Sequence, residues 1–292
     1  RDRLRSRGLG DVYKRQVIIE KSDGGFTYQA TDIATIKMRV DDLHADEIIY
    51  FVDKRQSLHF EQVFEVVEKL GIAPGVKLQH IGFGTVNGAD GKPFKTRDGG
   101  VMNLADMIKM SKDKVAESMP APDEAKGITR EYIDRLVSQI AVGAIKFQDL
   151  KNNIASGYVF ELDDFANFDG KTGPYIQYAV ARINSIMRKN QNLVPGAVVI
   201  TNPEERALGL KLTQLSSVVF RAEADKEPSV ISDYAYTLAQ LFSSFYNASP
   251  IMGAETSEIA ASRLALARLT RDVLVKLLYL LGIEAPEAML KA

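Results

Sequence analysis

The feature that most constrains the fold is the continuous apolar run Ile48–Val52, which reads IIYFV. Such an unbroken run is typical of a strand buried on both faces of a parallel sheet, whereas a half-exposed strand alternates apolar and polar residues. Apolar residues at helical spacing flank the run, from Ile33 to Leu43 before it and from Phe60 to Leu70 after it. Further β-prone segments lie within Val17–Gln29 and over Val76–Val86. The order β-α-β-α-β predicts a doubly wound α/β sheet.

The second half of the sequence has a helical period almost throughout. We expect helices over residues 128–153, 175–189, 203–223, 229–247 and 255–282. The segment Met110–Gly127, rich in Lys, Asp, Ser and Pro, is interpreted as an exposed hinge or insertion, and Asp169–Pro174 as a domain boundary. The expected fold class is therefore α/β plus all-α, with an α/β domain over residues 17–168 and a helical bundle over residues 172–292.

Composition excludes several kinds of site. The chain of 292 residues has no Cys and only three His, His44, His59 and His80, which are scattered along the chain. Disulfides, thiol nucleophiles and Cys-based zinc sites are thereby excluded, and no metal site is predicted. No apolar run is long enough to span a membrane, so we expect a cytoplasmic protein with no membrane partner.

Residues 1–16 differ from the rest of the chain in charge. Their six basic and two acidic residues give +4, and since the whole chain carries −1, the remainder carries −5. One interpretation is a basic arm that binds nucleic acid. A non-native or disordered leader is the interpretation that we prefer, because no later segment continues its pattern.

Polar residues follow the predicted strands at their carboxyl ends, where doubly wound sheets bind ligands. Tyr28 and Asp32 follow the first strand and Gln56 the second, and the glycine-rich segment Phe83–Leu104 follows the third. A carboxylate at Asp32 suits a guanidinium or ammonium group. In the glycine-rich segment, two cations and a hydroxyl suit a polyphosphate: Lys95, Thr96 and Arg97.

Each of these residues also has an ordinary structural interpretation. Thr31 or Asp32 would serve as the N-cap of the first helix, and Tyr28 and Gln56 would be polar residues at a strand end and in a loop. The glycine-rich segment would then be a solvated connection.

One helical face in the second half combines aromatic and basic residues. Tyr175, Tyr178 and Arg182 lie at i, i+3 and i+7 of a predicted helix. Unstacked bases stack on aromatic rings and on guanidinium planes, so this face is a candidate RNA-binding surface. Packing at the rim of the bundle is the alternative.

Several stretches together resemble the C-terminal half of arginyl-tRNA synthetases, a class I aminoacyl-tRNA synthetase family. They are EKSDGGFTYQATDIATIKMR, IIYFVDKRQSLHFEQVF, QHIGFGTVNGADGKPFKTRDGG, GPYIQYAVARI, ASRLALARL and LGIEAPEAM, in that order over residues 19–292. The resemblance implies a partial Rossmann-like catalytic domain followed by a helical anticodon-binding domain. It implies an arginine–tRNA ligase, which activates L-arginine with ATP, accompanied by Mg²⁺, and transfers it to the 3′ end of tRNA(Arg). We also expect a monomer.

The resemblance also assigns roles to particular residues. Tyr28, Asp32 and Gln56 match the family's amino-acid pocket. ATP is expected near His59, Phe83, Gly84 and Val86. Lys95, Thr96 and Arg97 correspond to the family's KMSKS signature, here degenerate because Asp98 follows Arg97. For the tRNA, the matching residues are Tyr175, Tyr178, Tyr246 and Met289, and Arg182 is added because it shares the helical face of the first two.

The family's HIGH-type motif, which holds ATP, does not occur in this sequence. We therefore expect a partial chain that is inactive by itself, because half of the ATP site is missing. The alternative to an enzyme is a non-catalytic tRNA-binding or regulatory paralogue. The retained Tyr28, Asp32 and Gln56 argue against that alternative.

Overall fold

The computed structural model describes residues 17–88, 91–92, 103–160 and 169–290. The leader 1–16 and the expected phosphate-binding residues Lys95, Thr96 and Arg97 lie outside this part of the chain. Contacts divide the described chain into two compact units. The first extends to Thr85 and includes Ala155–Gly157, and the second comprises Val86–Ile154 and the chain from Tyr158 onward.

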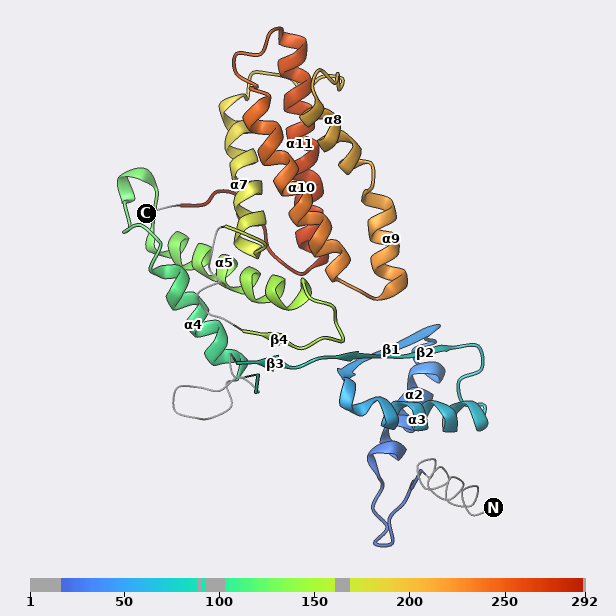
Figure 1. Cartoon of the computed structure of the whole chain (residues 1–292). Coiled ribbons are helices and arrows are strands. Elements are labelled where there is room, and N and C mark those ends of the chain that lie inside the picture. Colours follow the sequence, from blue (N-terminus) through green and yellow to red (C-terminus); the bar gives the residue numbers. More distant parts are fainter. Residues whose placement is uncertain (1–16, 89–90, 93–102, 161–168, 291–292) are drawn as a thin grey trace. The chain divides into compact units, whose positions relative to one another are not determined.

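A parallel pair of strands forms the centre of the first unit (Figure 1). Strand β1 (Glu47–Asp53) contains the predicted apolar run, and β2 (Lys77–Phe83) pairs with it from Glu47↔Lys77 to Asp53↔Phe83. The connection passes through η1 (Lys54–Gln56) and α3 (Ser57–Lys69), as a parallel crossover requires. Helix α2 (Tyr28–Asp41) precedes β1. The predicted α/β class is confirmed.

The N-terminal end of this unit differs from the prediction. The segment expected to form a strand around Val17 and Phe26 makes only an isolated bridge, between Glu20 and Phe26. Helix α2 begins at Tyr28 and is capped by Thr27, whose Oγ1 accepts from the N–H of Ala30 at 3.3 Å. The expected cap at Thr31 or Asp32 is wrong, because a side-chain cap can start a helix ahead of its first apolar residue.

The predicted strand Val76–Val86 is two separate strands. Between β2 and β3 (Val86–Asn87) the chain passes Gly84, where an added Cβ would lie 2.3 Å from the backbone nitrogen of Gly157. Strand β3 then pairs in parallel with β4 (Tyr158–Val159), apart from β1 and β2. Gly84 thus lies between the two pairings in the sequence, at a point where an added Cβ would meet backbone atoms.

Two helices follow β3 along the chain in the second unit. Helix α4 (Leu104–Ala116) begins after Asn103, whose side chain accepts from the N–H of Asp106, and α5 (Arg130–Leu150) begins after Thr129. The interpretation of residues 110–127 as a hinge is wrong for its first third. The helix continues to Ala116 because Ser111 and Val115 are buried on its inner face despite the charged residues around them.

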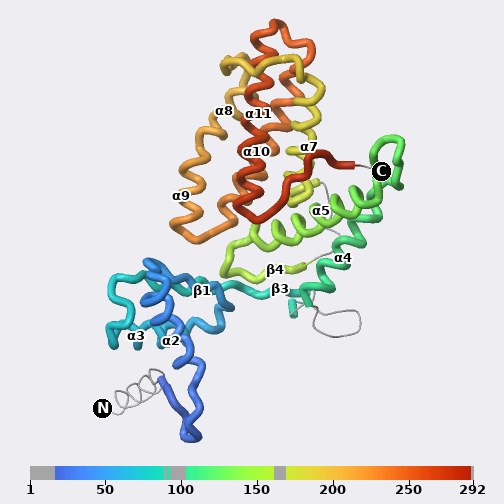
Figure 2. The backbone as a smooth tube through the Cα atoms, turned by 180° about the vertical axis from the view of Figure 1, so that it is seen from behind, coloured from blue at the N-terminus to red at the C-terminus, as the bar shows by residue number. Residues whose placement is uncertain are grey.

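Five further helices build the bundle of the second unit, with α7, α10 and α11 side by side in both views (Figures 1 and 2). They are α7 (Gly173–Lys189), α8 (Pro203–Leu212), α9 (Leu215–Asp225), α10 (Ser229–Ala248) and α11 (Ser257–Leu280). The helix predicted over 203–223 is thus two helices with a break at Thr213 and Gln214. The bundle contains the largest apolar core of the described chain, including Ile183, Leu238, Phe242 and Leu274. None of the described helices combines the length and the apolar character that a membrane crossing demands.

Candidate functional site

Helices α2 and α3 bring a carboxylate and an imidazole into contact. Nε2 of His59 lies 2.6 Å from Oδ2 of Asp32, across a sequence separation of 27 residues. The side chains are 21% and 31% exposed, respectively. Asp32 follows the first turn of α2 and His59 is in the first turn of α3, so the pair lies at the N-terminal ends of both helices. Both residues were predicted as site residues, but their contact was not.

Tyr28 and Gln56 lie near this pair in the sequence and are exposed. Tyr28, at the start of α2, is 85% exposed and precedes Asp32 by four residues, which places both on one face of the helix. Gln56 ends η1 and is the N-cap residue of α3. Both side chains are therefore accessible to a ligand that reaches Asp32 from solvent.

An ion pair lies at the carboxyl end of β1. The side chain of Arg55 binds both carboxylate oxygens of Asp53 at 2.6 to 3.0 Å, and the N–H of Arg55 also donates to Asp53. These hydrogen bonds, the side-chain bonds foremost, lower the pKa of Asp53 to about 2. Asp53 is therefore ionised at neutral pH, and it also caps η1.

The residues predicted to lie near ATP are in several elements. Phe83 ends β2 and is 43% exposed, and Gly84 follows it against the backbone of Ser156 and Gly157. Val86 begins β3 and packs with Ala144 and Phe160 in a small apolar cluster of the second unit.

Aromatic and basic side chains of α7 and α10 meet on one face of the bundle. The guanidinium carbon of Arg182 lies 4.5 Å from the ring centroid of Tyr246. The ring of Tyr175 lies 5.4 Å from that of Tyr236, whose hydroxyl accepts from Nε2 of Gln240 at 3.0 Å. Tyr236 and Gln240 were not predicted. Tyr236 lies ten residues and Gln240 six residues before Tyr246, and the two are four residues apart on α10. This helical spacing is the sequence signal that could have identified them.

The chain after α11 runs back across α5 and α7 (Figure 2). Buried Gln177 donates to the carbonyls of Gln139 and Glu284 at 3.1 and 2.8 Å, and Asn184 donates to that of Glu287 at 3.1 Å. Met289, a predicted tRNA contact, is partly buried there against a cluster that includes Ile133 and Val137. This apolar packing fixes the position of Met289.

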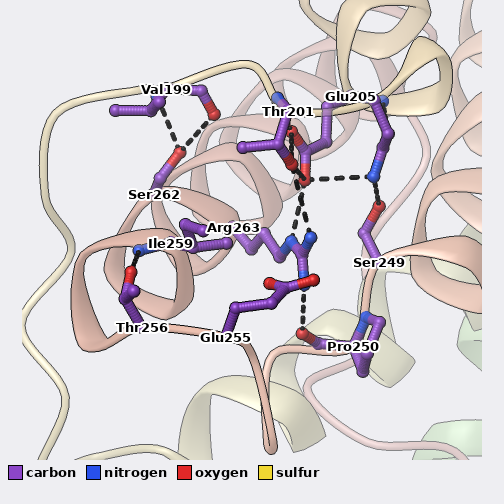
Figure 3. Close-up of polar contacts among 11 residues, drawn as sticks. Val199, Thr201, Glu205, Ser249, Pro250, Glu255, Thr256, Ile259, Ser262 and Arg263 are labelled. Carbon is purple, nitrogen blue, oxygen red and sulfur yellow. Dashed lines mark hydrogen bonds and ion pairs between the residues drawn. The ribbon is translucent and has the colours of Figure 1, made fainter.

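A buried ion pair that the sequence analysis missed joins α8 to α11 (Figure 3). Nε of Arg263 lies 2.7 Å from Oε1 of Glu205, and both side chains are almost inaccessible to solvent. Arg263 also donates to the carbonyl of Pro250 at 2.9 Å, and the N–H of Thr201 donates to Glu205 at 2.6 Å. Burial raises the pKa of Glu205, but the hydrogen bonds from Thr201 and Arg263 outweigh burial, so the net pKa lies below its usual value.

A sequence signal for Glu205 did exist. Asn202 accepts from the N–H of Glu205 at 2.8 Å and thereby caps α8, and Glu205 follows three residues later, as in a capping box. Arg263 offered no such signal, because the apolar period of α11 does not distinguish a buried arginine from a solvated one. Within the described ranges, no group of three His, Asp or Glu residues is placed to hold a metal ion.

Comparison with known proteins places this arrangement in a family. The catalytic domain described as "tRNA synthetases class I (R)" matches residues 11–162, and the DALR anticodon binding domain matches residues 176–289. The chain is similar to the arginine–tRNA ligase of Hyphomonas neptunium, with 44% identity over 277 residues, covering 94% of this chain and 47% of that protein. The Francisella tularensis arginine–tRNA ligase is 43% identical over 283 residues, again covering 94% of this chain and 47% of that protein.

Solved structures agree with these sequence matches. The arginyl-tRNA synthetase of Thermus thermophilus superimposes with a TM-score of 0.78 at 26% identity, covering 94% of this chain and 51% of that one. For the Plasmodium falciparum enzyme the TM-score is 0.75 at 28% identity, with 93% and 46% covered. The chain spans about half the length of the curated relatives that it matches. By its sequence and its fold, the chain belongs to the class I arginyl-tRNA synthetase family.

Proposed function

We propose that the protein carrying this chain is an arginine–tRNA ligase, which activates L-arginine with ATP and transfers it to the 3′ end of tRNA(Arg). The observation that carries the proposal is the partly exposed carboxylate of Asp32, held on α2 in a chain whose relatives are named arginine–tRNA ligases. An ionised carboxylate forms bidentate hydrogen bonds with a planar guanidinium, which the ammonium of lysine cannot reproduce.

In the proposed amino-acid pocket, Asp32 pairs the guanidinium, and Tyr28 and Gln56 orient the substrate by hydrogen bonds. The exposure of Tyr28 and Gln56 supports this assignment, because both are open to a ligand arriving from solvent.

On the nucleotide side, we assign ATP to the neighbourhood of Phe83, Gly84 and Val86. Lys95, Thr96 and Arg97 would stabilise the negative charge that develops on the phosphates during adenylate formation. Mg²⁺ is expected to enter the site bound to the phosphates of ATP. The resemblance predicts His59 beside ATP, but its contact with Asp32 favours the amino-acid pocket.

For the tRNA, we assign recognition to Tyr175, Tyr178, Arg182, Tyr246 and Met289. The contact between Arg182 and Tyr246 supports the assignment, because a base can stack on either a guanidinium plane or a ring. We further propose that residues 17–168 belong to the catalytic domain and residues 172–292 to the anticodon-binding domain. The protein is proposed to act in the cytoplasm as a monomer.

The test is arginine-dependent exchange of pyrophosphate into ATP, with and without tRNA(Arg), by the intact protein that carries this chain. Asp32→Ala is expected to lower kcat/KM for arginine by at least about a hundredfold, since a charge-assisted bidentate contact is lost. Asp41→Ala is the matched control, because Asp41 is an exposed carboxylate on the same helix, paired with Lys37.

An intact protein that binds tRNA but shows no arginine-dependent exchange would instead favour the non-catalytic paralogue. Full exchange by Asp32→Ala would remove Asp32 from the arginine pocket.

A further inference from the structure

The contact between His59 and Asp32 fixes one oxygen of the carboxylate that the proposed function assigns to arginine. The contact is short, at 2.6 Å, and it joins two helices rather than two neighbours in sequence. Because an ionised carboxylate can only accept, the Nε2 of His59 is the donor.

Both helices are anchored immediately beside the contact. Ile33, next to Asp32, and Phe60, next to His59, are buried in the first unit, at 9% and 4% exposure. The ring of Phe60 stacks on His80 with a centroid distance of 4.8 Å and lies 4.6 Å from the ring of Tyr50 on β1. Packed neighbours of this kind restrict the rotation of both polar side chains, as a preorganised binding site requires.

The remaining acceptor capacity of Asp32 suits a second donor. A carboxylate offers about four lone-pair positions, and the imidazole occupies one of them on Oδ2. A bidentate guanidinium needs one position on each oxygen, so Oδ1 and the second lone pair of Oδ2 suffice. The imidazole and a guanidinium can therefore bind the same carboxylate together.

We propose that His59 is a positioning residue, which holds the Asp32 carboxylate in the orientation that receives the side-chain cation of the amino-acid substrate. The identity of that substrate as arginine rests on the function proposed above. His59 then acts on amino-acid affinity through Asp32, and it does not contact the nucleotide.

A first experiment tests the pairing itself without any substrate. In nitrogen-15 NMR of the intact protein that carries this chain, the imidazole resonance of His59 is assigned by its loss in His59→Gln, and His44 and His80 serve as internal references. Asp32→Asn is expected to shift the Nε2 resonance of His59 while the other two stay in place. An unchanged His59 resonance in a folded Asp32→Asn protein would overturn the proposal.

A second experiment separates positioning from nucleotide binding, using pyrophosphate exchange by the intact protein that carries this chain. His59→Ala is expected to raise KM for arginine by about tenfold or more, the usual effect of losing a hydrogen bond to a charged group. KM for ATP is expected to stay within about twofold of the wild-type value. His59→Gln, whose amide can donate in place of Nε2, is expected to recover most of the arginine affinity. His44→Asn is the control, because His44 has a φ of 52°, which asparagine tolerates.

The outcomes are distinguishable. An increase in KM for ATP with KM for arginine unchanged would assign His59 to the nucleotide and overturn its positioning role, while the proposed function would stand. Equal losses in His59→Gln and His59→Ala would also overturn it, because hydrogen-bond donation would then not be the property that matters. A wild-type protein without arginine-dependent exchange would remove the proposed function, and this assignment with it.

Discussion

At the scale of single residues, the buried pair of Arg263 and Glu205 should be among the most sensitive positions of the second unit. Arg263→Ala leaves the Glu205 carboxylate buried without its cation, which is expected to cost about 3 to 5 kcal/mol of unfolding free energy. Arg268 is an exposed arginine on the same helix, so Arg268→Ala should change the unfolding free energy by less than about 0.5 kcal/mol. Urea denaturation of both variants measures the difference. Equal stabilities would show that solvent reaches Glu205.

The same pair predicts a dependence on pH. The pKa of Glu205 is lowered in the folded protein, so its stabilising effect is present above the ordinary glutamate pKa and is lost as the pH falls through the folded value. Wild type should therefore lose more unfolding free energy than Glu205→Gln when the pH is lowered from about 6 to about 3. Parallel pH profiles for the two proteins would contradict the lowered pKa.

Gly84 is a residue whose replacement should affect the first unit. Its added Cβ would lie 2.3 Å from backbone atoms of Ser156 and Gly157, which cannot rotate away as a side chain does. Gly84→Ala is expected to cost about 1 to 3 kcal/mol of unfolding free energy. In Gly209→Ala the nearest atom is 3.9 Å away and the glycine is helical, so that variant should be neutral or stabilised by up to about 1 kcal/mol. Thermal unfolding followed by circular dichroism compares the two, and similar shifts would show that the chain at Gly84 can move aside.

At the scale of elements, the face shared by α7 and α10 is expected to bind RNA through its rings. Tyr246→Ala removes the ring under Arg182 and should weaken tRNA(Arg) binding by about tenfold, the usual contribution of one stacked base. Tyr279→Ala is a matched control, since Tyr279 on α11 is 72% exposed and lies beside a cation, Lys276. Filter binding at a fixed salt concentration gives both affinities. If both substitutions weakened binding equally, RNA would bind exposed tyrosines anywhere on the bundle and not specifically the face shared by α7 and α10.

At the scale of the whole molecule, the two compact units differ in the size of their apolar cores. In the first unit the main apolar cluster has five buried residues, Ile33, Ile36, Ile48, Val63 and Val67, with Phe60 also buried, whereas the bundle core of the second unit extends over all five of its helices and their connections. Hydrogen exchange of backbone amides should therefore be at least about tenfold slower in the middle of α7, α10 and α11 than in β1 and β2. Equal protection in both units would indicate a single cooperative unfolding transition.

The sequence predicted those elements that have a strong apolar period of their own. The run at Ile48–Val52 is β1, and the periodic segments gave α3, α5, α7, α10 and α11 close to their observed bounds. Prediction failed where a single polar contact or a short buried face sets the boundary. Thr27 starts α2 a full turn early, and buried Ser111 and Val115 keep α4 helical within a charged segment.

By itself, the sequence determined the class of fold and the family, because periodicity and local motifs are properties of contiguous residues. It also named candidate site residues, including Asp32 and His59. Only the tertiary structure decided that these two meet, that Tyr236 joins Tyr175, and that Arg263 is buried against Glu205. Each of these contacts joins residues of different helices, and their distance depends on how those helices pack, which no local pattern encodes.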